Sequence, residues 1–322
     1  MTSNPPIRAA VIGVGYLGKF HAQKYAALPG AELVAVADAD AETARNIAKT
    51  HQAEYASDYH ELLGKVDAVS IVVPTQLHHQ VARTFLENGV HVLLEKPMTT
   101  TVAEAQELVE LADKQARVLQ IGHLERFNPA VLALADILDR PLFIESHRVA
   151  PFNPRGADVN VILDLMIHDI DLILDMVGEA PTRIDVSGVP VLSSDIDIAN
   201  ARLQFASGCV ANVTASRAGL KSERKMRIFQ HDAYITIDFQ GKVLGVHRKG
   251  EGEMYPGIAE INSEERAFEQ GDALLSEIEA FLKAINNNTP AVVSGEAGMR
   301  ALETAVRITT LLQQAREPRR GE

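Results

Sequence analysis

Three short segments of the chain carry residues that can do chemistry, and each lies beside a stretch able to hold it in place. Residues 13–18 have the pattern G-x-G-x-x-G directly after an apolar run. Residues 95–97 read Glu-Lys-Pro at the end of another apolar run, and Asp164 and His168 lie four residues apart in a third. A glycine turn can approach a phosphate closely, while a lysine, a carboxylate and a histidine can move a proton to or from a hydroxyl oxygen. The chemistry to consider is therefore proton transfer beside a phosphate-bearing ligand.

The glycine pattern is typical of a dinucleotide-binding turn. Its first glycine permits a tight turn, its second lets the backbone approach a pyrophosphate, and its third lets the helix pack on the strand. Asp38 follows Gly18 by 20 residues at the end of the next apolar run, where a carboxylate can bond the adenosine ribose hydroxyls. Glycines that served only as turn formers would not require this acid. The predicted cofactor contacts in this region are Gly13, Gly15, Tyr16, Leu17, Gly18 and Asp38.

Asp38 also indicates which dinucleotide binds. Its carboxylate would repel a 2′-phosphate, and neither Ala39 nor Asp40 offers a cation to hold one, so NAD is favoured over NADP. Further contacts are expected beyond the carboxyl ends of later strands, where ligands bind in open α/β sheets. These are Thr75, His78, Glu95 and Lys96. His78 has the alternative of facing solvent in the first turn of a helix. The histidines show no metal-ligand spacing, so no metal is predicted.

Strand-length apolar runs alternate with helix-length periodic segments in the first third of the chain. Strands are expected at 9–12, 33–37, 68–73, 91–94 and 118–121, and helices at 16–28, 42–50, 78–88 and 102–115. Continuous apolar strands separated by helices are typical of a doubly wound parallel sheet. Residues 1–122 are therefore predicted to form an α/β dinucleotide-binding domain of the Rossmann type.

The remaining residues, 123–322, have a different pattern. Helices are expected at 129–138, 161–177, 267–286 and 295–315, and strands at 142–149, 183–189, 199–205, 209–215, 226–230, 234–238 and 243–247. Successive strands without helices between them indicate an antiparallel or mixed sheet. The second domain is therefore predicted to be α+β, with a mostly antiparallel open sheet.

The predicted helix at 161–177 is apolar nearly all round, which is typical of a buried helix. Its polar residues fall in one narrow line, formed by Asp164, His168, Asp171 and Asp175. Asp164 and His168 stand on adjacent turns of one face and can interact. A histidine beside a carboxylate can accept a hydroxyl proton near neutral pH. The alternative is a pair that only satisfies its own hydrogen bonds within a core.

Composition narrows the class of protein. A length of 322 residues fits two domains, and a net charge of −12 argues against a nucleic-acid partner. No apolar run approaches the roughly 20 residues of a membrane helix, and the first residues lack a signal-peptide pattern. The single cysteine, Cys209, cannot form an internal disulfide, so the cytoplasm is the expected location. A basic run at 217–227 is interpreted as a solvated strand edge.

The glycine pattern with Asp38, the Glu-Lys-Pro segment, and Asp164 with His168 together resemble the Gfo/Idh/MocA family of oxidoreductases. The resemblance covers essentially the whole chain. It implies a Rossmann domain followed by an α/β domain whose open sheet serves in oligomerisation, as a homodimer or homotetramer. It also implies a catalytic group in which His168 accepts the proton, Lys96 hydrogen-bonds the reacting oxygen and Asp164 orients its neighbours. Members of the family differ on whether the lysine or the histidine moves the proton.

Two stretches, 122–129 and 163–171, resemble a narrower group within the family. Its members oxidise the sugar 3-hydroxyl of UDP-N-acetylglucosamine to a ketone, which an aminotransferase then uses on a route to lipid A with a 2,3-diamino sugar. Arginine can bind the diphosphate of such a substrate through paired donors. The candidate substrate contacts are Lys96, Arg126, Asn128, Arg148, Arg155, Asp164 and His168. Each of the three arginines has the alternative of a surface or structural role.

Two other functions fit parts of this pattern. The first is oxidation of another nucleotide sugar, or of a free polyol such as inositol, because sibling enzymes can share short motifs. The second is a nicotinamide-binding protein that senses redox state without turnover. The set of Lys96, Asp164 and His168 argues against a sensor, since sensing needs no proton acceptor.

Overall fold

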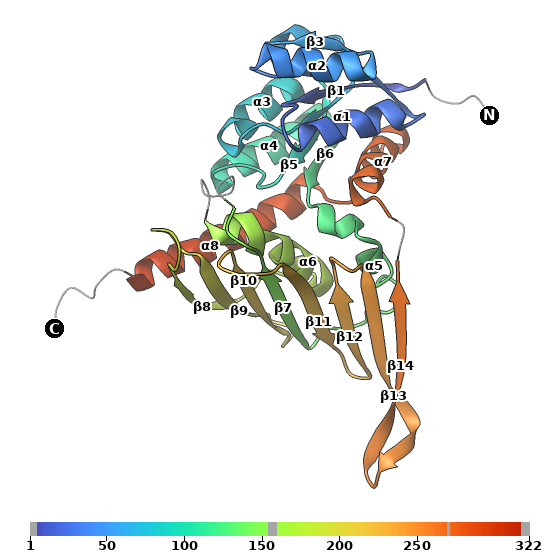
Figure 1. Ribbon diagram of the computed structural model, residues 1–322, viewed down its shortest axis with the longest axis vertical. Coiled ribbons are helices and arrows are strands. Elements are labelled where there is room, and N and C mark those ends of the chain that lie inside the picture. Colours follow the sequence, from blue (N-terminus) through green and yellow to red (C-terminus); the bar gives the residue numbers. More distant parts are fainter. Residues whose placement is uncertain (1–4, 154–159, 269–270, 317–322) are drawn as a thin grey trace, which may run out of the picture. The chain divides into compact units, whose positions relative to one another are not determined.

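The computed structural model describes residues 5–153, 160–268 and 271–316 (Figure 1). The chain divides into two compact units. The first unit comprises the described part of Met1–Leu124 together with Asp272–Met299. The second comprises the described parts of Glu125–Gly271 and Arg300–Glu322.

Six parallel strands form the sheet of the first unit, in the order β3-β2-β1-β4-β5-β6. They are β1 (Ile7–Ile12), β2 (Ala31–Ala37), β3 (Glu54–Ala56), β4 (Ala68–Ile71), β5 (His91–Glu95) and β6 (Leu119–Gly122). Ala9, Ala10 and Val11 of the central strand are fully buried, because helices cover both faces of the sheet. The doubly wound α/β fold predicted from the sequence is confirmed. The short strand β3 at the sheet edge was not expected.

Helices connect these strands at nearly the expected places. They are α1 (Gly18–Ala27), α2 (Ala41–His51), the 3-10 turn η1 (Tyr59–Leu62), α3 (Thr75–Glu87) and α4 (Val102–Gln115). A capping box fixes the start of α4: the Thr101 hydroxyl accepts the Glu104 N–H at 3.2 Å, and the Glu104 carboxylate accepts the Thr101 N–H at 3.0 Å. α1 begins at Gly18 rather than at residue 16, so Tyr16 and Leu17 belong to the glycine turn.

The chain returns to the first unit at α7 (Ala273–Asn287), which packs against α1 (Figure 1). Ile278 and Phe281 of α7 are fully buried in one apolar cluster with Ala22 and Tyr25 of α1. This packing explains why residues 272–299 belong to the first unit, whereas the sequence analysis assigned everything after residue 122 to a second domain. Such packing depends on which apolar faces contact each other in the folded protein. The order of the elements along the chain does not reveal it.

Eight strands form the sheet of the second unit, in the order β14-β13-β12-β11-β7-β10-β9-β8. They are β7 (Phe143–Val149), β8 (Arg183–Val189), β9 (Ile198–Gln204), β10 (Val210–Ser216), β11 (Glu223–Phe229), β12 (Ala233–Asp238), β13 (Val243–Tyr255) and β14 (Ile258–Ala267). β7 and β10 pair in parallel, and all other neighbours are antiparallel. The predicted α+β unit with a mostly antiparallel open sheet is confirmed.

The strands β13 and β14 form a hairpin that continues beyond the ends of the other strands (Figure 1). β14 was not expected, and the helix expected at 267–286 begins only at Ala273. Nine of the ten residues of β14 are exposed. A strand exposed on both faces has no alternation of apolar and polar residues, so the sequence carries no signal for it.

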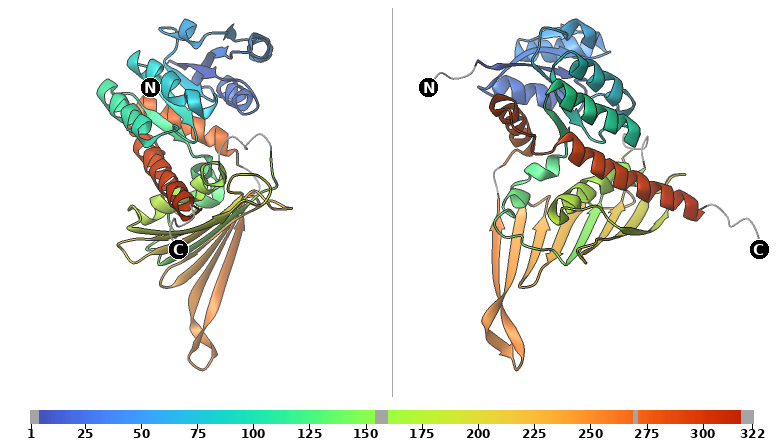
Figure 2. Two further views of the ribbon diagram at one scale, coloured as in Figure 1. Left: turned by 90° about the vertical axis from the view of Figure 1, so that its left-hand side faces the viewer. Right: turned by 180° about the vertical axis from the view of Figure 1, so that it is seen from behind.

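Helices cover one face of this sheet and leave the other face open (Figure 2). The covering elements include the π-helical turn η4 (Ile162–Met166), α6 (Ile167–Val177) and the part of α8 (Gly295–Arg316) that belongs to this unit. Preceding β7 are the 3-10 turn η2 (Leu124–Phe127) and α5 (Pro129–Leu132), a shorter helix than the one expected at 129–138. Within the described residues, no helix has the length and apolarity needed to cross a bilayer.

Residues of the basic run at 217–227 lie on both faces of the eight-stranded sheet and in a buried polar network. β11 lies between β12 and β7, so the interpretation of this run as a strand edge is wrong. Met226 and Ile228 are fully buried on the helix-covered side, whereas Lys225 and Arg227 at alternate positions are exposed on the open side.

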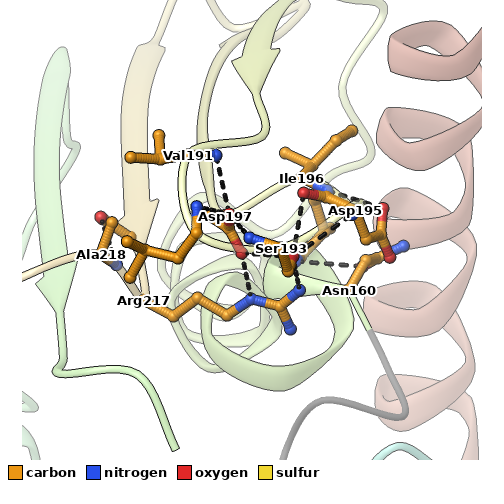
Figure 3. A network of polar contacts seen from close by, with 11 residues as sticks. Asn160, Val191, Ser193, Asp195, Ile196, Asp197, Arg217 and Ala218 are labelled. Carbon is orange, nitrogen blue, oxygen red and sulfur yellow. Dashed lines mark hydrogen bonds and ion pairs between the residues drawn. The ribbon is translucent and has the colours of Figure 1, made fainter.

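Arg217, at the start of the basic run, has a structural role (Figure 3). Its Nε donates to Asp197 Oδ1 at 2.9 Å, and the Ser193 hydroxyl donates to the same oxygen at 2.7 Å. The other carboxylate oxygen accepts the backbone N–H groups of Val191 and Ser193. These donors outweigh the effect of burial and hold the pKa of Asp197 far below its ordinary value. Arg217 therefore anchors the loop that precedes β9.

Candidate active site

Two of the three glycines of the turn, Gly13 and Gly18, occupy positions that a side chain could not. Gly13 has φ +84°, and a Cβ there would lie 2.6 Å from the carbonyl oxygen of Val72. A Cβ on Gly18 would collide with the carbonyl oxygen of Gly13, whereas nothing lies within 4 Å of the corresponding point on Gly15. The first and third glycines therefore permit the turn and its packing, and the second leaves open space for a ligand.

Asp38 is held rigidly at the carboxyl end of β2. Its Oδ2 accepts the Val14 N–H at 2.8 Å, and its Oδ1 accepts the Asp40 N–H at 2.9 Å. A cavity of about 390 Å³ lies beside it. Among the lining residues are Gly13, Gly15, Asp38, Ser57, Asp58, Tyr59, Pro74 and Leu77. An open glycine turn, a fixed carboxylate and an adjoining cavity fit the pyrophosphate, ribose and adenine of a dinucleotide.

His78 does not face solvent. The side chain is buried in α3, with Nδ1 2.9 Å from the Pro97 carbonyl oxygen and Nε2 2.9 Å from the Val73 carbonyl oxygen. Burial lowers the pKa of His78, which favours the neutral ring. The histidine thus connects the end of β4 to the backbone that follows Lys96, which is a positioning role. Thr75, the other residue expected here, is the first residue of α3.

The Glu-Lys-Pro segment follows directly from β5. Glu95 Oε1 lies 3.2 Å from His21 Nε2, and its Oε2 accepts the Lys96 N–H at 3.1 Å. The Lys96–Pro97 peptide bond is cis. Burial opposes ionisation of Glu95, but the hydrogen bond from His21 and the nearby charges of His21 and Lys96 lower its pKa overall. Glu95 is therefore a carboxylate at neutral pH, fixed immediately before Lys96.

Asp164 and His168 lie at the junction of η4 and α6 in the second unit. The Asn160 side chain accepts the N–H groups of Ile162 and Leu163 at 3.1 and 3.0 Å, and its carbonyl accepts the Asp164 N–H at 3.0 Å. Both Asp164 and His168 are half-buried. The sequence predicted a regular α-helix here, whereas the first turn is π-helical. Single π-helical turns inside helices occur frequently at functional sites.

Arg126 and Arg148 are buried and engaged by carboxylates. Arg126 donates to both oxygens of Asp171, at 2.6 and 2.8 Å, and contacts Asp175 at 2.5 Å. Arg148 donates to both oxygens of Asp169 at 2.9 Å and to Glu125 at 2.9 Å. The side chains are 7% and 3% exposed, so these guanidinium groups are committed to the fold.

These ion pairs count against the predicted direct binding of the substrate by Arg126 and Arg148. Asn128 is likewise structural: it caps α5 by accepting the Ala130 N–H at 3.1 Å and donates to the Phe239 carbonyl oxygen. Arg155, the third candidate arginine, lies outside the described residues.

Two family descriptions match the chain. An oxidoreductase family with an NAD-binding Rossmann fold matches residues 7–123, and the GFO/IDH/MocA C-terminal domain matches residues 143–236. The chain belongs to the Gfo/Idh/MocA oxidoreductase family. The predictions of family, of an NAD-dependent dehydrogenase and of NAD as cofactor are confirmed.

Relatives within the family cover nearly the whole chain. The chain is 41% identical over 308 residues to UDP-N-acetylglucosamine 3-dehydrogenase of Acidithiobacillus ferrooxidans, covering 95% of this chain and 97% of the relative. A solved structure of an enzyme of that name from the same organism matches with a TM-score of 0.92 and 40% identity, covering 98% of this chain and all of that one. Inositol 2-dehydrogenase of Rhizobium meliloti is 26% identical over 316 residues, covering 93% and 94% of the two chains.

Several residues of this family member were missed by the sequence analysis. Ser57, Asp58 and Tyr59 line the cofactor cavity, but they follow the unexpected strand β3. Glu125 and Asp169 lie within residues 122–129 and 163–171, but nothing in the sequence identifies them as partners of Arg148. No group of three or more His, Cys, Asp or Glu that could hold a metal ion occurs among the described residues.

Proposed function

We propose that this enzyme oxidises the 3-hydroxyl of the sugar in UDP-N-acetylglucosamine to a ketone, with NAD as hydride acceptor. The observation that carries the proposal is the 41% identity to a UDP-N-acetylglucosamine 3-dehydrogenase across 95% of the chain. The geometry supports it, because the glycine turn and Asp38 fit the cofactor and the chain carries Lys96, Asp164 and His168 as candidate catalytic residues.

In this proposal Lys96, Asp164 and His168 carry out the proton transfer. The glycine turn and Asp38 would hold NAD, which would supply the hydride acceptor, and the hydroxyl proton would go to the protein. Lys96 donates a hydrogen bond to the reacting oxygen, which stabilises the negative charge that develops there. His168 accepts the hydroxyl proton, and Asp164 orients or tunes its neighbours. Glu95 and His78 contribute indirectly, by fixing the backbone on either side of Lys96.

The diphosphate of the substrate needs a cation whose donors are not already used. Arg224 on β11 alternates with Met226, so it lies on the helix-bearing face with Arg148. Its Nη1 is 3.9 Å from Glu125, whose oxygens already accept bonds from Arg148 and Asn128. Within the described residues the Arg224 guanidinium makes no hydrogen bond, and the side chain is 46% exposed. We therefore assign diphosphate binding to Arg224 in place of Arg126 and Arg148.

The test is incubation with NAD and a panel of UDP-, GDP- and dTDP-sugars, N-acetylglucosamine and myo-inositol, read by NADH absorbance. We expect turnover of UDP-N-acetylglucosamine, little turnover of the free sugar, and a 3-keto product trapped with hydroxylamine. The remote nucleotide supplies binding energy for positioning, so truncation lowers kcat as well as affinity. Equal turnover of the free sugar, or oxidation at another carbon, would contradict the assignment. Preferential oxidation of inositol would favour the activity named for the Rhizobium meliloti relative.

A redox sensor without turnover remains the alternative of a different class. It would bind NAD tightly and form no NADH with any sugar in the panel. The same experiment separates it from the proposed dehydrogenase, provided that NAD binding is measured in parallel by calorimetry.

The proposal extends to partners. A 3-keto sugar is the substrate type of an aminotransferase, and we place the enzyme in the cytoplasm on a route to a diamino sugar for lipid A. We also propose that copies associate through the open face of the second sheet as a homodimer or homotetramer. That face carries a row of stacked rings from Phe229 through Tyr234 to His247, with centroids 4.8 and 5.1 Å apart. Replacing Tyr234 by Glu should dissociate the oligomer, which sedimentation measures.

A further inference from the structure

Glu277 is a fully buried carboxylic acid that the first unit receives from α7. Neither of its carboxyl oxygens has a hydrogen-bond partner among the described residues. Its backbone carbonyl accepts a hydrogen bond from the Gln120 side-chain amide at 3.0 Å. An unpaired carboxylate in a dry interior is strongly disfavoured, so such a group holds its proton.

The groups around Glu277 come from three elements. α1 contributes Tyr25, whose hydroxyl is 3.0 Å from the Ser70 hydroxyl, and β6 contributes Gln120. β5 contributes Glu95, whose charge acts on Glu277 together with burial to raise the Glu277 pKa well above its ordinary value. Within the described residues, His21 Nδ1 and Gln120 Oε1 also lack hydrogen-bond partners.

Two buried carboxyl groups that interact do not both ionise at neutral pH. Glu95 has the donors, because His21 and the Lys96 N–H bind its two oxygens, whereas Glu277 has none among the described residues. The single negative charge of the pair therefore resides on Glu95, directly before Lys96. The proton resides on Glu277.

We propose that Glu277 keeps its proton in the folded enzyme, so that one carboxylate of this pair, that of Glu95, and no more, stands next to Lys96. This inference deepens the proposed function, because it rests on the assignment of Lys96 to the reacting oxygen. It makes α7, which lies far along the chain from the glycine turn, part of the electrostatic surroundings of Glu95.

The sign of the pH dependence follows from the raised pKa. Below pH 4.5, the ordinary pKa of a glutamate, the folded protein and the unfolded chain both hold the proton. Above it the unfolded chain releases the proton while the folded protein retains it, so Glu277 makes stability fall as pH rises. Glu277→Gln has nearly the same shape and cannot ionise. We expect the Tm of this variant to gain on wild type by about 3 °C or more between pH 5 and pH 8.

Glu279→Gln is the matched control, because Glu279 lies on the same helix but is exposed. Its Tm difference from wild type should stay constant across the same pH range. If the Glu277→Gln and wild-type curves run parallel, Glu277 does not hold a proton and the proposal is overturned. These measurements need no substrate, so they remain decisive even if the proposed reaction is wrong.

A spectroscopic measurement tests the same proton without any variant. If the variants do not fold, infrared spectroscopy of the wild-type protein decides: a band from a buried protonated carboxyl is expected at pH 7, and its absence contradicts the proposal.

Discussion

The two units bury polar groups in different ways. In the second unit Arg126 and Arg148 each meet a carboxylate through paired donors, and every one of these charges has an opposite partner at hydrogen-bond distance. In the first unit Glu95 is paired with His21, but Glu277 beside it has no hydrogen-bond partner among the described residues. Pairs of opposite charge keep their contacts over a wide pH range. A cluster with more buried carboxyl groups than cations must instead keep one carboxyl group protonated.

The difference indicates what each cluster does. The pairs of the second unit connect η2 and β7 to α6, the helix that carries His168, so they hold the helix in place. In the first unit Glu95 directly precedes Lys96, the proposed catalytic lysine, and the charge of Lys96 acts on Glu95. Charge pairs therefore give rigidity in the second unit, whereas in the first unit we propose a stored proton close to Lys96.

The largest expected effect comes from breaking a matched pair. Arg148→Met leaves Asp169 buried and without its cation, so the free energy of unfolding should fall by about 3–5 kcal/mol. Arg183→Met is the control, because the Arg183–Asp185 pair is exposed and should contribute less than about 1 kcal/mol. Urea unfolding measures both. Equal small losses would show that the buried pair is not needed for rigidity.

The next effect tests proton transfer. His168→Ala should lower kcat by about a hundredfold or more, while NAD affinity stays near wild type. A histidine base also gives the pH profile an acidic limb, which the alanine variant should lack. Lys96→Met should reduce turnover as well, because the reacting oxygen loses its cationic partner. If His168→Ala keeps a near-normal kcat, the histidine is structural and Lys96 must take the proton.

The cofactor preference gives an intermediate effect. Asp38→Ser removes a carboxylate that accepts ribose hydroxyls and repels a 2′-phosphate, so the preference for NAD over NADP should fall by about thirtyfold. The ratio of kcat/KM values for NAD and NADP measures it. Wild-type enzyme that used NADP as well as NAD would contradict the role given to Asp38.

The sequence predicted those features that depend on local backbone requirements. Gly13 and Gly18 could be assigned because no side chain fits there, and α4 had the expected bounds because Thr101 and Glu104 cap it. Long-range pairing could not be predicted. Arg126 and Asp171 are 45 residues apart, and only the fold shows that they meet. For the same reason, the sequence could not predict that α7 packs in the first unit, or that Glu277 lies near Glu95.

The smallest expected effect distinguishes the two faces of β11. Arg224 shares the helix-bearing face with the matched pair of Arg148, but only Arg224 makes no hydrogen bond through its guanidinium within the described residues. A single charge-assisted hydrogen bond to a phosphate contributes about 1.5 kcal/mol. Arg224→Gln should therefore lower kcat/KM for UDP-N-acetylglucosamine by about tenfold and weaken UDP binding in calorimetry by a similar factor, without changing NAD affinity.

Arg227→Gln provides the matched control for this last prediction. Arg227 lies three residues further along β11 on the open face, 3.5 Å from Glu145 and 54% exposed. Removing the same charge there should leave UDP binding unchanged, because Arg227 lies on the opposite face of the sheet from Arg224 and solvent screens exposed charges. If both variants weaken UDP equally, a general attraction between basic residues and phosphate explains the result. If neither does while wild type still oxidises the UDP-sugar, the diphosphate binds elsewhere, and Arg224 is as structural as Arg148.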